Sequence, residues 1–229
     1  MSRVLAVSPH LDDAVFSAGA TLARHAGEGD EVVVLTCLTG NVARPEGFAL
    51  ACQLDKGLGP DVDYMALRRT EDTAACEHIG ARAVHWPFLE APHRGYGDAA
   101  ALFGPARADD DLADRLAPEL AALFEELRPD TIYGPYGVGE HVDHRAVRAA
   151  LSRVTGKAIW WEDFPYAMRE DRAVQGIVRH EVDDEWLAVK GRAALAYQSQ
   201  VGFQFGSPQE AAKVLGGWRC EGFSDGPAA

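Results

Sequence analysis

The fold is decided near the start of the chain by residues 4–38, which read VLAVSPHLDDAVFSAGATLARHAGEGDEVVVLTCL. Residues 4–8 and 31–38 are apolar, rich in β-branched side chains and without helical periodicity, as buried strands are. Between them, residues 14–26 carry alanine and leucine at helical spacing and stop at Gly27. A strand, a helix and a strand in this order predict two parallel strands joined by a crossover helix.

The same alternation continues to about residue 161. Further helices are predicted at residues 65–79, 110–127 and 145–154. Further strands are predicted at residues 83–88, 131–135 and 158–161. This order indicates an α/β fold with a mostly parallel sheet and helices on both faces. Beyond residue 162 the alternation weakens, so we expect an irregular or mixed C-terminal third.

The composition favours one soluble domain over residues 1–229, since 47% of them are hydrophobic and no repeat or linker divides the chain. Its 22 basic and 35 acidic residues give a net charge of −13, which argues against nucleic acid or an anionic membrane as partner. No apolar run reaches the ~18 residues of a membrane span, and no leader precedes Val4, so we expect a cytoplasmic protein. The sequence is compatible with an oligomer.

The cysteines do not form a metal-binding or redox motif. They are Cys37, Cys52, Cys76 and Cys220. Because no two of them are separated by two residues, neither a zinc knuckle nor a redox pair is indicated. We expect buried or incidental thiols that hold no metal.

Two connections, residues 39–64 and 89–109, are longer than ordinary loops. Both follow predicted strands, so both should rise from the carboxyl edge of the sheet, where open α/β folds bind ligands. We expect residues 91–109 to cover the site and to contact the substrate. The side chains in this segment that suggest such contacts are Arg94, Tyr96, Phe103 and Arg107.

The first motif that carries chemistry is SPHLDD at residues 8–13, between the first strand and the first helix. An imidazole and carboxylates on such a turn suit a borderline cation such as Zn²⁺. One of the adjacent carboxylates of Asp12 and Asp13 can bind the metal while the other faces the open coordination position. The alternative is structural, with Asp12 or Asp13 capping the helix and His10 in the turn.

The second motif is GEHVDH at residues 139–144, which lies between the predicted strand at 131–135 and the helix that follows. It should therefore occupy the same edge of the sheet as the first motif. A catalytic zinc site takes three protein ligands and leaves a fourth position for water. His10, Asp13 and His144 would make that set. Two motifs at strand ends favour a metal site over a helix start that is merely rich in His and Asp.

These parts fit the hydrolysis of an amide, because zinc lowers the pKa of bound water to roughly 7 and polarises a carbonyl. Asp12, which stands beside a ligand without being one, is the candidate base. His141 is the candidate stabiliser of the oxyanion. Asp143 is the candidate partner that fixes an imidazole tautomer.

The two motifs and their long separation resemble those of the PIG-L/LmbE family of zinc-dependent N-deacetylases, over about residues 4–200. The resemblance implies a Rossmann-like fold and deacetylation of N-acetylglucosaminyl groups in glycolipids, low-molecular-weight thiols and antibiotics. It implies that His10, Asp13 and His144 bind zinc. It also implies that Asp12 is the general base and that His141 binds the oxyanion.

The chain departs from the family's His-Pro-Asp-Asp-Glu motif, because Leu11 and Ala14 replace the proline and the glutamate. Neither change removes a catalytic group, but the local support of the metal turn must differ. The variant is similar to a branch of bacterial glycan and natural-product deacetylases. The resemblance further implies that Arg68 and Glu90 bind substrate. The alternatives are a solvated pair between Arg68 and Glu71, and an ordinary loop acid at Glu90.

The remaining conspicuous residues are interpreted as structural. The aromatic segment WWEDFPY at 160–166 could line a sugar site by stacking, but packing in the core is the commoner role. Lys190 and residues 197–200 are treated as structural. Five histidines without a partner at ligand spacing are expected at the surface or hydrogen-bonded in the core: His25, His78, His85, His93 and His180.

The sequence thus predicts a hydrolase dependent on zinc, or on another divalent metal, that deacylates an aminosugar-bearing small molecule. An amidase of low-molecular-weight thiol conjugates is the alternative with the same chemistry. A nucleotide-binding transferase would need a glycine-rich loop after the first strand, and residues 8–13 contain no glycine. A non-catalytic binding module would have no reason to keep a base beside an open metal position.

Overall fold

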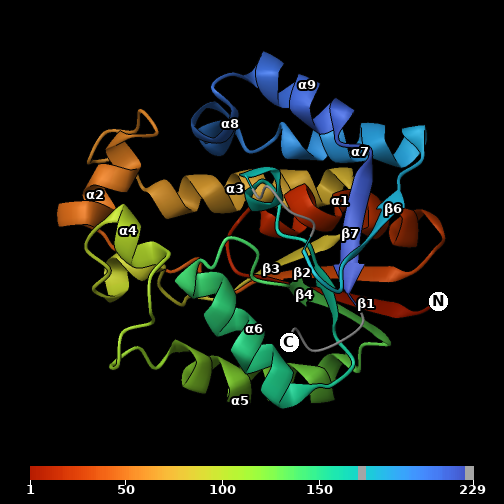
Figure 1. Ribbon diagram of the computed structural model, residues 1–229, viewed down its shortest axis with the longest axis horizontal. Helices are drawn as coiled ribbons and strands as arrows, with labels where there is room; N and C mark the ends of the chain where they lie inside the picture. The colour runs from red at the N-terminus through yellow and green to blue at the C-terminus, as the bar shows by residue number, and fades with distance from the viewer. Residues whose placement is uncertain (170–173, 225–229) are drawn as a thin grey trace.

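The structure is a computed structural model that describes residues 1–169 and 174–224. Its centre is a seven-stranded sheet in the order β3-β2-β1-β4-β5-β7-β6 (Figure 1). The parallel strands are β1 (Arg3–Ser8), β2 (Glu31–Thr36), β3 (Arg82–His85), β4 (Thr131–Pro135) and β5 (Ile159–Trp161). The antiparallel strands are β6 (Val178–Glu181) and β7 (Cys220–Ser224). The predicted α/β class with a mostly parallel sheet is confirmed.

Helices cover both faces of the sheet, as Figure 1 shows. One face carries α1 (Asp13–Gly27), α3 (Tyr64–His78), α7 (Asp184–Ala194), α8 (Gln198–Phe205) and α9 (Pro208–Gly217). The other face carries α5 (Leu112–Leu127) and α6 (Val142–Val154). Alternate residues of β1 serve the two cores, with Val4 and Ala6 toward α1 and Leu5 and Val7 toward α5. This double burial explains why β1 is apolar at successive positions.

Three short helices lie within segments that the sequence predicted to be long loops. They are α2 (Gly47–Leu54), the 3₁₀ helix η1 (Ala91–Arg94) and α4 (Ala99–Leu102). The predicted strand at residues 83–88 ends at His85, where the pairing with β2 stops. The C-terminal third is more regular than expected, because α7, α8 and α9 precede β7 and a second 3₁₀ helix, η2 (Tyr166–Arg169), follows β5.

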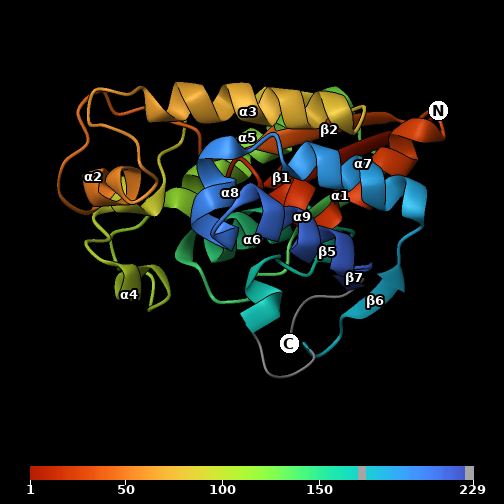
Figure 2. The same ribbon diagram turned by 90° about the horizontal axis from the view of Figure 1, so that it is seen from above.

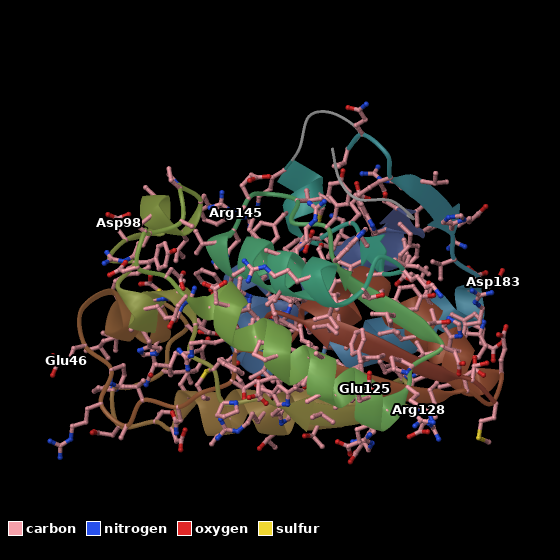
Figure 3. All side chains as sticks on the ribbon, turned by 90° about the horizontal axis from the view of Figure 1, so that it is seen from below. Glu46, Asp98, Glu125, Arg128, Arg145 and Asp183 are labelled. Atoms are coloured by element: carbon pink, nitrogen blue, oxygen red, sulfur yellow. The ribbon has the colours of Figure 1, made fainter. Side chains whose placement is uncertain are left out.

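The strand order reverses at β1, which has β2 on one side and β4 on the other. The carboxyl ends of β1 and β4 therefore meet at the point where open α/β sheets bind ligands. Helices α2 and α4 project beyond this edge, at the left of Figures 1 and 2. In Figure 3, Glu46 and Asp98, which precede these helices, lie at the end opposite Arg128. Among the described residues, no helix is both long enough and apolar enough to cross a membrane.

Candidate functional site

In the turn after β1, neither carboxylate of the first motif caps the helix that follows. Asp12 precedes α1 with φ 156° and ψ −31°, and its side chain makes no capping hydrogen bond. Ser8 Oγ instead accepts the Ala14 N–H at 3.2 Å and donates to the His10 carbonyl at 2.8 Å. Asp13 Oδ2 accepts the His10 N–H at 2.9 Å. The structural alternative, in which Asp12 or Asp13 serves as a helix cap, is therefore not what the turn shows.

The second motif is formed where α6 begins. His141 is the residue before this helix, and its Nδ1 accepts the Asp143 N–H at 3.2 Å. Gly139 has φ 82°, and a Cβ at this position would lie 2.8 Å from the Tyr166 ring. A glycine is needed here, because any larger residue would push the turn away from that ring. The turn places His144 in the first turn of α6, fully buried.

The structure brings together the three residues predicted to bind metal. Asp13 Oδ2 lies 3.1 Å from His10 Nδ1 and 3.2 Å from His144 Nε2. Ligand atoms about 2.0–2.1 Å from a tetrahedral zinc ion would be roughly 3.3 Å apart, so these separations suit one shared ion. Two imidazole nitrogens and one carboxylate oxygen are also a donor set that zinc prefers.

The unused hydrogen-bonding capacity of His144 supports the same conclusion. Although Asp13 Oδ2 lies 3.2 Å away, His144 Nε2 is buried and forms no hydrogen bond with any residue that the structure describes. Its Nδ1 lies 2.7 Å from Asp163 Oδ1, and His10 Nε2 lies 2.8 Å from Asp143 Oδ2. Each carboxylate holds the ring proton on one nitrogen, so the other nitrogen presents a lone pair. The residues fit a bound divalent metal.

A second group of potential ligands, His10, His141 and Asp143, is also close enough to share an ion. Its atoms already have partners, however. Asp143 Oδ2 interacts with His10 and accepts the Ala91 N–H at 3.1 Å, while Oδ1 accepts from Arg94 at 2.7 Å. Despite burial, these hydrogen bonds and charges hold the pKa of Asp143 well below its ordinary value. The second group is therefore less suited to an ion than the first group, His10, Asp13 and His144.

The candidate base and the candidate oxyanion stabiliser line one cavity beside these ligands. Burial raises the pKa of Asp12 to about 7, against the opposing charge of Arg68. Burial lowers the pKa of His141 to about 3, so its ring is neutral at pH 7. Because His141 Nδ1 accepts a hydrogen bond, the proton of the neutral ring resides on Nε2. Nε2 is therefore a hydrogen-bond donor.

Arg68 and Glu90 also line the cavity, and they bind one another. Arg68 Nη1 lies 2.5 Å from Glu90 Oε1, and Nη2 lies 3.7 Å from Asp12 Oδ1. The alternative of a solvated pair with Glu71 is wrong, because Arg68 is only 4% exposed. Glu71 instead accepts hydrogen bonds from the backbone and hydroxyl of Ser199 at 2.8 and 2.6 Å.

Two site residues were missed by the sequence analysis. Asp163 follows β5 at the same sheet edge, and besides His144 it binds the backbone N–H groups of Gly137 and Val138 at 2.6 and 2.8 Å. Its position after a strand was the available signal, but we interpreted its segment as core aromatics. His93, interpreted as a surface or core histidine, lies half-buried in the cavity wall.

The segment 91–109 mainly supports the candidate site and covers its cavity only in part. Pro92, His93 and Leu102 line the cavity, and the Phe103 ring lies 5.3 Å from that of His141. Three other side chains that we expected to contact the substrate are paired with aspartates instead. Arg94 and Tyr96 bind Asp110, and Arg107 binds Asp109; none of the three lines the cavity.

A family model described as PIG-L, GlcNAc-PI de-N-acetylase, matches residues 5–155, which include both motifs. The chain belongs to the PIG-L family. Among its relatives, 2'-N-acetylparomamine deacetylase of Streptomyces fradiae is 33% identical over 175 residues, or 74% of this chain. The 1D-myo-inositol 2-acetamido-2-deoxy-alpha-D-glucopyranoside deacetylase of Thermobifida fusca is 31% identical over 204 residues, or 79% of this chain.

The matched regions cover 59% and 67% of these two relatives, so this PIG-L chain spans about three fifths to two thirds of their length. This chain matches a larger share of one solved structure than of these two relatives. It is the zinc-inhibited form of the teicoplanin deacetylase Orf2, with a TM-score of 0.80 and 30% identity. That match covers 93% of this chain and 90% of the other. The fold and the arrangement of elements therefore agree along nearly the whole chain.

Proposed function

We propose that this PIG-L chain is a zinc-dependent N-deacetylase of an aminosugar-bearing small molecule. The observation that carries the proposal is the convergence of His10 Nδ1, Asp13 Oδ2 and His144 Nε2 beside the carboxylate of Asp12. Both curated relatives are named for deacetylation of an acetamido sugar, which favours this substrate class over thiol conjugates. The zinc-inhibited form of the teicoplanin deacetylase supports a divalent ion at this site.

Such an ion supplies Lewis-acid polarisation of the acyl carbonyl and lowers the pKa of water. The side chains carry out the proton transfers and stabilise the developing charge. Asp12 faces the cavity without being one of the three proposed ligands, so it accepts a proton from the water that attacks the carbonyl carbon. When the carbon–nitrogen bond breaks, Asp12 returns this proton to the departing amine. The products are acetate and the free amino group.

His141 stabilises the charge that develops on the carbonyl oxygen. Its neutral ring donates a hydrogen bond from Nε2, and its Nδ1 is fixed by the Asp143 N–H. A donor held in place before the reaction needs no reorganisation as the negative charge appears. Asp143 and Asp163 act through the proposed ligands, because Asp143 fixes the tautomer of His10 and Asp163 fixes that of His144.

Arg68 and Glu90 orient the substrate. A guanidinium and a carboxylate at the cavity wall can donate to and accept from sugar hydroxyl groups. The same Arg68 lies 3.7 Å from Asp12, so it also positions the base and balances its charge. Arg68 therefore connects recognition of the sugar with Asp12, the carboxylate that transfers the proton.

The proposal is tested by acetate release from a panel of N-acetylated aminosugars. Chelated protein should release no acetate, and one equivalent of zinc should restore the activity; excess zinc is avoided because a related deacetylase has a zinc-inhibited form. Asp12→Asn is the matched control for contaminating hydrolases, since it is purified in the same way and lacks the base. Release that persists after chelation, or that is unchanged in Asp12→Asn, would overturn the proposal.

A further inference from the structure

Helix α2 has an unusual distribution of buried residues. Its sequence is GFALACQL, yet its only buried residue is Gln53, whose amide donates to the carbonyls of Gly59 and Val62 at 2.6 and 3.2 Å. Leu54 at its end is 48% exposed. A helix that is apolar around its circumference is normally buried in a core. This helix instead projects beyond the carboxyl edge of the sheet (Figures 1 and 2).

Exposed apolar side chains gather at the same place. Within residues 1–169 and 174–224, the large apolar side chains at the surface are Met1, Leu54, Val62, Phe103, Met168, Val178 and Phe203. Val62 and Phe203 line the same cavity as the proposed metal ligands His10 and Asp13. Leu54, Phe103 and Met168 do not line the cavity themselves, but each is within two positions of a lining residue in the sequence. Since the Phe103 ring lies 5.3 Å from that of the lining residue His141, three of these side chains are at the cavity.

The cavity has two chemically different sides. One side carries the proposed ligands His10 and Asp13 with Asp12, Arg68 and Glu90. The other side comes from the segment 39–64 and from α8, which also contribute Asn41, Gln53, Gln200 and Gln204 to the lining; we call its apolar residues the apolar wall. It consists of Val42, Pro45, Ala49, Val62 and Phe203.

The ammonium group of Lys56 also lies near this wall. Lys56 Nζ donates to the carbonyl of Cys52 at 2.9 Å and lies 4.4 Å from the centre of the Phe203 ring. The ammonium group therefore lies over one face of the Phe203 ring, and the Phe203 side chain remains 54% exposed. A ligand at the wall meets aliphatic and aromatic surface, while the amide groups of Asn41, Gln53, Gln200 and Gln204 lie elsewhere in the same lining.

We propose that the substrate carries a bulky apolar group beside its acylated aminosugar, and that this group lies against the apolar wall. The inference rests on the proposed function. It follows because the wall and the proposed catalytic groups line one continuous cavity, so a molecule that places its amide at Asp12 also reaches Val62 and Phe203. An anionic membrane is a poorer occupant, because the chain has a net charge of −13.

The test compares the methyl and hexyl β-glycosides of N-acetylglucosamine with the zinc-loaded full chain, below the micelle concentration of the hexyl compound. We expect kcat/KM for the hexyl glycoside to be about 10-fold or more above that for the methyl glycoside, since methylene groups in an apolar pocket have effects of this size. Phe203→Ala should remove most of this advantage. Val178→Ser, at an exposed valine far from the cavity, is the matched control and should keep it.

Equal kcat/KM values for the two glycosides would overturn the inference. An advantage that survives in Phe203→Ala and Val62→Ser would also overturn it, because the wall would not be the cause. If the apolar wall instead binds a second copy of the chain or a lipid surface, Phe203→Ala would abolish dimerisation or binding to phosphatidylcholine vesicles. The ratio of the kcat/KM values for the two glycosides would then stay unchanged.

Failure of the proposed function would look different, because neither glycoside would be hydrolysed. Calorimetric titration of Asp12→Asn with both glycosides then tests the wall separately from the reaction. Tighter binding of the hexyl compound that depends on Phe203 supports the inference, and equal binding contradicts it.

Discussion

Arg94 connects the segment 91–109 with the proposed metal centre, because its Nη1 lies 2.7 Å from Asp143 Oδ1. The other edge of the same guanidinium binds both carboxylate oxygens of Asp110, at 3.1 and 2.7 Å. Asp143 in turn lies 2.8 Å from His10 Nε2. The four side chains form one chain of contacts, so Asp110 and Arg94 hold the carboxylate that orients a ligand.

Arg94→Met should therefore weaken metal binding by about 10- to 100-fold, as loss of groups that orient metal ligands does. The affinity is measured by competition with a chelator on protein whose fold is verified by circular dichroism. Arg107→Met is the matched control, because Arg107 also pairs with an aspartate in this segment but is exposed and does not contact Asp143. Wild-type affinity in folded Arg94→Met would show that Asp143 needs no such support.

His144→Ala should give a folded protein that has lost most of its metal, because a buried nitrogen ligand is removed from a three-residue site. Elemental analysis after dialysis measures the metal content. Stoichiometric zinc in this variant would refute the proposed ligand set.

Asp12→Asn should retain the metal and lower turnover by about 10²-fold or more, since positioned general bases contribute 10²–10⁴. The asparagine keeps the shape of the side chain but cannot accept the proton. Rates and metal content are measured on the same sample. Near wild-type turnover on a substrate confirmed with the parent protein would assign the base to another group.

His141→Ala should lower kcat by about 10²–10³-fold with a smaller effect on KM, because the oxyanion contact forms mainly in the transition state. Steady-state kinetics at saturating and at low substrate separate the two parameters. A rise in KM alone would make His141 a substrate-binding residue.

Lys190→Met should lower the free energy of unfolding by about 3–5 kcal/mol, because it leaves the buried Glu221 carboxylate without its cation. Lys190 Nζ lies 2.8 Å from Glu221 Oε1, and both side chains are buried. Urea unfolding measures the change. Arg153→Met is the control, since it breaks an exposed pair with Asp114 and should cost less than about 1 kcal/mol. Equal losses in the two variants would contradict this account.

The sequence predicted the fold where periodicity is strong. The central strands of the sheet are continuous apolar runs and α5 is amphipathic, so their patterns indicate their structure locally. The two motifs could be placed together because both follow parallel strands, whose carboxyl ends share an edge. Helix α2 was not predicted, because an apolar helix that is not buried has no one-sided pattern.

The roles of Asp163 and Arg94, which support the proposed metal ligands, could not be predicted, because the partners of these residues are distant in the sequence. Asp163 binds His144 only because β5 is the neighbour of β4, and the sequence does not reveal that order. Arg94 was interpreted as a substrate contact, since its positive charge in a long loop indicates binding but not to which group. Its partner Asp143 lies in the first turn of α6, where Ala91 of the same segment also binds it.

The position of β1 between β2 and β4 also has a consequence for folding. An ion held by His10, Asp13 and His144 would tie the start of the chain to a turn beyond its middle, and so act as a reversible cross-link. Closing so long a loop is entropically costly in the unfolded chain, and an ion that binds only the folded state stabilises it by its binding free energy. The amino-terminal β1–α1 unit and the β4–α6 unit would then separate more readily once the ion is withdrawn.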